Sequence, residues 1–166
     1  GIYRPVWMYT GGKGYIRREG IRVTTLSVNP AQVQVEVDAS GGLPAVELLD
    51  PSGRVVASGS GADLTLTVPD ARLWSEDSPS LYTCRGTLIE VGELLDEAAV
   101  SFGIRRIQWN ARQGLLVKSQ SVKLRGACVH HDNGVVGACA FPESEERRVR
   151  KLKQAGFNAI RSAHNP

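Results

Sequence analysis

Short segments rich in β-branched and apolar residues recur along the first two-thirds of the chain, and no other feature constrains the fold as strongly. Residues 33–38 alternate apolar and polar side chains with a period of two, which is typical of a strand with one buried face. Turn-forming residues, such as Asp50-Pro51-Ser52-Gly53, separate successive segments. The candidate strands are 21–28, 33–38, 45–49, 54–57, 64–68, 81–90 and 98–104. Strands spaced by roughly 8–12 residues predict an immunoglobulin-like β-sandwich.

The cysteines argue against an antibody-like or disulfide-stabilised version of this sandwich. The chain has three of them, Cys84, Cys128 and Cys139, and it lacks the Cys…Trp…Cys pattern of antibody domains. An odd and small number of cysteines is typical of proteins in a reducing compartment, so a cytoplasmic location is the default. The first residues resemble the middle of a protein rather than a signal peptide. Because such a peptide can lie upstream, a periplasmic or secreted location stays open and localisation is unknown.

Composition and charge exclude several classes of protein. With 42% hydrophobic and 22% charged residues, the chain can build a core, and disorder is not expected. No apolar run reaches the roughly 18–20 residues of a membrane-spanning helix. The 20 basic and 17 acidic residues are dispersed, and only 6% of residues are aromatic. The sequence therefore predicts neither a membrane nor a nucleic acid as partner.

The last third of the chain changes character and predicts a strand–helix–strand unit. Residues 115–118 and 122–129 are strand candidates, and a helix follows with Ser144 as its N-cap and Gly156 just after its end. Residues 157–161 are then expected to form a buried strand. A strand, a helix and a second strand in this order predict a parallel pair. Because two parallel strands cannot cover both faces of a sheet, we expect this part to begin a larger α/β domain.

Polar side chains follow both of the predicted parallel strands. They are His130, His131, Asp132 and Asn133 after the first strand, and Arg161, Ser162, His164 and Asn165 at the second. The carboxyl ends of strands form the ligand face of α/β sheets, so these residues are a candidate binding site. Strand-end caps are the structural alternative. A zinc site that also uses Cys128 and Cys139 is a weaker one, because the spacing matches no zinc motif.

In these stretches the chain resembles the glycoside hydrolases of family 2, which include β-galactosidase and β-glucuronidase. The stretches are residues 1–7, Leu73-Trp74-Ser75 with Pro79, Leu81 and Tyr82, Phe102-Gly103-Ile104-Arg105, 122–132 and 156–166. The resemblance implies three parts. Residues 1–14 would be the tail of an N-terminal jelly-roll sugar-binding domain, 15–104 the immunoglobulin-like sandwich, and 105–166 the incomplete start of a catalytic (β/α)₈ barrel.

The resemblance also implies roles for individual residues. Arg161 matches the arginine that orients the nucleophilic glutamate, and a guanidinium beside a carboxylate keeps it ionised. His130, Asp132, His164 and Asn165 match positions that bind the sugar. Imidazole, amide and carboxylate groups can hydrogen-bond ring hydroxyls. No metal ligand or cofactor is expected.

The family hydrolyses β-linked glycosides by a retaining mechanism that uses two glutamates, one as acid/base and one as nucleophile. No glutamate of this chain matches either motif, because both are expected on later barrel strands. We therefore expect a β-glycosidase as the parent protein and an inactive chain as given, without catalytic residues of its own. Asn133-Gly134 and Gly137-Ala138 favour a galactosidase-like member.

The alternative function is a non-catalytic module. It would either bind carbohydrate, with Trp7 or Trp109 stacked on a sugar, or serve as a scaffold. Exposed strand edges and apolar surface beyond about residue 120 predict self-association or domain swapping through that segment.

Overall fold

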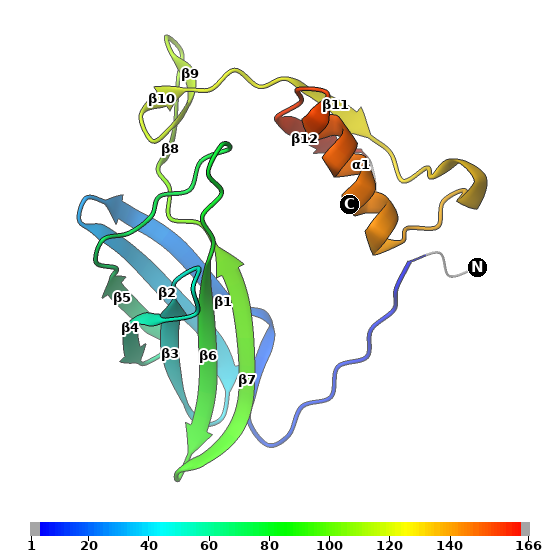
Figure 1. Cartoon of the computed structure of the whole chain (residues 1–166). Helices are drawn as coiled ribbons and strands as arrows, with labels where there is room; N and C mark the ends of the chain where they lie inside the picture. Colours follow the sequence, from blue (N-terminus) through cyan, green and yellow to red (C-terminus); the bar gives the residue numbers. More distant parts are fainter. Residues whose placement is uncertain (1–3, 164–166) are drawn as a thin grey trace. The chain divides into compact units, whose positions relative to one another are not determined.

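The computed structural model describes residues 4–163, which form two compact units (Figure 1). One unit contains residues 10–121, and the other combines residues 4–9 with 122–163. The domain boundaries expected after residues 14 and 104 stay predictions. Each unit is described by itself.

The first unit is built on two antiparallel sheets, which confirms the predicted sandwich (Figure 1). One sheet has the strand order β1-β2-β5 and the other β4-β3-β6-β7. The strands are β1 (Tyr15–Val28), β2 (Ala31–Ser40), β3 (Leu43–Leu49), β4 (Val55–Ser60), β5 (Asp63–Thr67), β6 (Tyr82–Glu90) and β7 (Glu93–Phe102). All seven correspond to segments that the sequence pattern predicts.

The core of the sandwich follows from the alternation of side chains along the strands. In β2, Val33 and Val35 are buried while Gln34 between them is half-buried on the other face. In the second sheet Leu48 and Leu88 are fully buried, and they join the valines in one hydrophobic cluster. Because successive residues of a strand point to opposite faces, a period of two is enough to place one inner face per sheet.

Two motifs that lie far apart in the sequence meet at the end of β7. The backbone N–H of Trp74 donates to the carbonyl oxygen of Ile104 at 2.9 Å. The Trp74 side chain lies so close to Gly103 that a Cβ there would be 2.9 Å from three of its atoms. The guanidinium carbon of Arg105 lies 4.7 Å from the centre of the Trp74 ring, within range of a cation–π contact. Gly103 is therefore required by this close approach.

Burial raises the pKa of the Cys84 thiol in β6 to about 11. An unfolded chain releases this proton near pH 8.5, so between these two values only the folded state keeps it. The free energy of unfolding is therefore expected to fall as the pH rises from about 8 to 11. Urea unfolding at several pH values should show a shallower decline for Cys84→Ala than for the unsubstituted chain. Equal slopes would contradict the prediction.

A small antiparallel sheet completes the first unit. It consists of β8 (Ile107–Asn110), β9 (Gly114–Val117) and β10 (Gln120–Ser121), in the order β10-β9-β8. The predicted strand at 115–118 corresponds to β9. The strands β8 and β10 were not predicted from the sequence.

The second unit contains the predicted strand–helix–strand arrangement. Its elements are β11 (Gly126–Val129), the 3₁₀ turn η1 (Gly134–Val136), α1 (Pro142–Gln154) and β12 (Ala159–Ser162). The strands β11 and β12 pair in parallel, with Gly126 opposite Ala159 and Val129 opposite Ser162. Parallel pairing with a helical crossover is confirmed.

Several details of this unit differ from the sequence-based expectation. The first strand is shorter than predicted, 126–129 instead of 122–129, and the side chains of β12 are mostly exposed rather than buried. The helix begins at Pro142, not after Ser144; proline suits this first position because its missing N–H has no helical partner there. The predicted end is confirmed: Gly156 has a φ of 87°, and Phe157 N–H donates to Leu152 O at 3.1 Å.

Candidate functional site

The carboxyl ends of β11 and β12 lie level with each other, as in the predicted strand–helix–strand unit. Val129 and Ser162 are paired, and the next N–H along β12, that of Ala163, donates to the carbonyl oxygen of Val129 at 3.1 Å. The segment after β11 begins with His130. Ser162 and the polar segment that begins with His130 therefore lie at the same edge of the parallel pair.

The two faces of this pair carry different side chains. Val129 and Ile160 line a cavity of about 310 Å³ together with Val149 of α1, so this face is turned toward the helix. Cys128 and Arg161 are opposite each other in the register and lie on the other face. There the Nη1 of Arg161 donates to the Sγ of Cys128 at 3.4 Å. The predicted site arginine thus lies on the face away from the helix.

The loop after β11 is tied together by the side chain of Asn133. Its Nδ2 donates to the carbonyl oxygen of Cys139 at 2.8 Å and to Oε1 of Glu145 at 3.2 Å. Its Oδ1 accepts a hydrogen bond from the hydroxyl of Ser144 at 3.0 Å. The backbone N–H of Asn133 also donates to Gly137 O at 2.8 Å. Residues 133–139 therefore form a closed loop that is attached to the first turn of α1.

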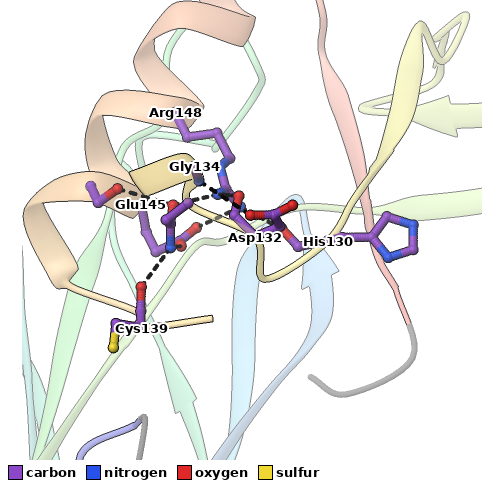
Figure 2. A network of polar contacts seen from close by, with 8 residues as sticks. His130, Asp132, Gly134, Cys139, Glu145 and Arg148 are labelled. Atoms are coloured by element: carbon purple, nitrogen blue, oxygen red, sulfur yellow. Dashed lines mark hydrogen bonds and ion pairs between the residues drawn. The ribbon is translucent and has the colours of Figure 1, made fainter. Parts of the chain in front are cut away.

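Arg148 attaches the same loop from the next turn of the helix (Figure 2). Its Nη1 donates to the carbonyl oxygen of His130 and its Nη2 to that of Asp132, each at 2.6 Å. It also donates to Asn133 Oδ1, and its Nη1 lies 3.3 Å from Oε2 of Glu145. Only 21% of the surface of its side chain is exposed. The guanidinium thus spans two backbone carbonyls, which its planar fork of donors favours.

The predicted site residues have the following places. The backbone of His130 faces Arg148, and its imidazole points away from the network (Figure 2). Asp132 begins the turn into η1, since its Oδ1 accepts the N–H of Gly134 at 3.2 Å. Arg161 lies on β12 beside Cys128. His164 and Asn165 lie outside the described residues.

Sequence reasoning missed the contribution of Arg148 and the contacts of Asn133. Arg148 was one of several basic residues on a solvated helix, and nothing in its local sequence distinguished it. One available signal was spacing. Arg148 follows Ser144 by four positions and Glu145 by three, so the three residues share one side of the helix. That side is the one that meets the loop.

The structure also bears on the suggested zinc site, on the acidic start of α1 and on the two candidate stacking tryptophans. Within residues 4–163, no three His, Cys, Asp or Glu side chains form a group able to hold a metal ion. Glu146 pairs with Arg150 at the i,i+4 spacing on the helix surface. In the same described range, no helix is both long and apolar enough to cross a bilayer. Trp7 and Trp109, the candidates for stacking on a sugar, are 71% and 73% exposed.

Comparison with known proteins identifies relatives of the whole chain. Residues 15–105 match the family model for glycosyl hydrolases family 2. The chain is 34% identical to the β-galactosidase BoGH2A of Bacteroides ovatus, with all of the chain and 22% of the relative aligned. It is 31% identical to a putative β-glucuronidase of Formosa agariphila, covering 99% of the chain and 17% of that protein.

The solved structures that match this chain include a member of the same family and a β-glucuronidase. A glycosyl hydrolase family 2 member from Bacteroides cellulosilyticus matches with a TM-score of 0.86 and 33% identity, over 94% of this chain and 24% of that one. The β-glucuronidase from Ruminococcus gnavus in complex with D-glucuronic acid matches with a TM-score of 0.85 and 27% identity, over 93% and 27%. The chain thus spans about a quarter or less of the length of these relatives.

Proposed function

The chain belongs to family 2 of the glycosyl hydrolases, and from this we propose that it is part of a retaining β-glycosidase. In this proposal β11, α1 and β12 are the first units of a (β/α)₈ barrel. The observation that carries the proposal is the parallel pair itself. It has a helix on one face, Arg161 on the other, and polar residues where both strands end. Ligand sites of such barrels are built at that edge.

The proposed roles follow from the chemistry of the side chains. His130 and Asp132, with His164 and Asn165, bind hydroxyl groups of the sugar ring. Arg161 orients and keeps ionised a nucleophilic glutamate from another part of the complete protein. Its position on the face away from α1 supports this role, because the inner face of a barrel is the one opposite the helices.

The pair of glutamates that a retaining mechanism needs is proposed to lie outside this chain, so that the chain alone is inactive. Two glutamates at the start of α1 are in line with this, because Glu145 is held by Asn133 and Arg148, and Glu146 by Arg150. Such contacts occupy both carboxylates with structural partners. The self-association expected beyond residue 120 stays a prediction.

The proposed substrate is a β-galactoside, on the strength of the small residues in the loop after β11. The names of the relatives include both β-galactosidase and β-glucuronidase, so the choice of sugar requires a direct test. Nitrophenyl β-galactoside, β-glucuronide, β-mannoside and β-glucoside should be offered to the complete protein and, in parallel, to the 166-residue chain.

We expect the complete protein to hydrolyse one of these glycosides, with retention at the anomeric carbon, and the chain alone to match the blank. Turnover by the isolated chain would contradict the assignment of its residues to sugar binding rather than catalysis. No turnover by either would favour the non-catalytic carbohydrate-binding or scaffold module. If the complete protein prefers another of these glycosides, the proposed substrate changes but the proposed β-glycosidase activity stands.

A further inference from the structure

We propose that Arg148 is a positioning residue of the glycosidase site, which sets the place of His130 and Asp132 without touching the substrate. This inference rests on the proposed function. The contacts that carry it are the two hydrogen bonds of 2.6 Å from the guanidinium to the carbonyl oxygens of His130 and Asp132. These two carbonyls flank the single residue His131.

The two bonds constrain the backbone rather than the side chains. A guanidinium whose two terminal nitrogens are each bonded to a carbonyl fixes the distance and the orientation of both peptide groups. The imidazole of His130 meanwhile points away from the network (Figure 2). Arg148 therefore acts on the peptide groups of His130 and Asp132.

The arginine is itself held in place, which a positioning residue requires. Glu145 lies one helical turn before it, with Oε2 at 3.3 Å from Nη1, and Asn133 Oδ1 accepts a further hydrogen bond from it. Asn133 in turn contacts Ser144, Glu145 and the carbonyl oxygen of Cys139. The loop and the first turns of α1 thus form one polar network, and a side chain locked on several sides aims its partners closely.

Helix α1 therefore has a second use besides covering the strand pair. Its side facing the loop carries Ser144, Glu145 and Arg148, whereas Arg150 pairs with Glu146 on the surface. Arg150 and Arg148 differ by two positions, have the same chemistry and lie on the same helix. This makes Arg150 a matched control for the removal of Arg148.

The test compares Arg148→Gln, Arg148→Lys and Arg150→Gln in the complete protein, with the glycoside that it turns over best. We expect Arg148→Gln to lower kcat/KM roughly 10- to 100-fold, mainly through KM, because the groups that bind the ring lose their alignment. Arg148→Lys should recover part of this loss, since one ammonium can reach one carbonyl. Arg150→Gln should stay within about twofold of the unsubstituted protein.

A double-mutant cycle separates positioning from a general loss of stability. If Arg148 acts through His130 and Asp132, Arg148→Gln should change kcat/KM little in a protein that already carries His130→Ala and Asp132→Ala. A merely structural role would lower activity by the same factor in both backgrounds. Hydrogen exchange over residues 130–139 should also speed up in Arg148→Gln and not in Arg150→Gln.

The outcomes distinguish this inference from the function on which it rests. A complete protein that hydrolyses a glycoside equally well with and without Arg148 contradicts the positioning role alone. A double-mutant cycle in which the effects of Arg148→Gln and of the His130→Ala, Asp132→Ala pair simply add also contradicts the positioning role. Absence of turnover by the unsubstituted protein contradicts the proposed function, and the positioning role is lost with it.

Discussion

Replacing Arg161 by alanine in the complete protein is expected to lower kcat by roughly 100-fold or more, as misplacing a reacting group commonly does. In the proposed site its guanidinium both aims the nucleophilic carboxylate and keeps it ionised. Without it the pKa of that carboxylate rises, because a nearby positive charge favours the charged form. The acidic limb of the pH profile of kcat/KM should therefore move to higher pH.

Arg161→Lys is the informative companion variant. It keeps the charge, so the acidic limb should stay close to its original pH, but it loses the planar fork and with it part of kcat. Steady-state rates measured across the pH range, with Arg150→Gln as the control arginine, check both statements. An alanine variant with unchanged kcat and an unchanged pH profile would remove Arg161 from the nucleophile's surroundings.

The second large effect concerns the sandwich. Leu48 in β3 is fully buried in the cluster that joins the two sheets. Leu48→Ala removes apolar contacts and leaves a cavity, a change that costs about 2–5 kcal/mol. Since small domains are stable by only about 5–15 kcal/mol, this is a large fraction of the free energy of unfolding.

Leu43 provides the matched control for this substitution. It lies in the same strand but is 76% exposed, so Leu43→Ala should cost less than about 0.5 kcal/mol. Urea unfolding of the two variants, followed by circular dichroism, measures the difference. Equal losses at the two positions would mean that the faces of β3 are not divided between core and solvent as described.

The strands of the sandwich could be predicted because their signal is local. Alternation such as that of residues 33–38 records which face of a strand is buried, whatever the strand pairs with. The end of the helix was equally local, since Gly156 adopts the left-handed conformation that glycine favours. Its beginning was predicted incorrectly, because the hydroxyl of Ser144, a good N-cap, is bonded to Asn133 of the preceding loop.

The candidate site could be predicted only in part, because many of its contacts join residues that are distant in the sequence. His130, Asp132 and Arg161 stood out by residue type and by their places at the ends of predicted strands, and their roles stay predictions. The contact between Arg161 and Cys128 depends on the register of β11 with β12, which no local pattern determines. The contacts of Arg148 depend on how α1 returns to the loop after β11.

Neighbouring residues and the order of the motifs were enough to predict the series of strands, the parallel strand–helix–strand unit and the family. The tertiary structure alone decided that Trp74 lies against Gly103 and that Arg148 bonds the backbone beside His130. These contacts join residues 29 and 18 positions apart. Closing loops of this length costs conformational entropy, which the packing of the whole unit must offset, so no local pattern encodes them.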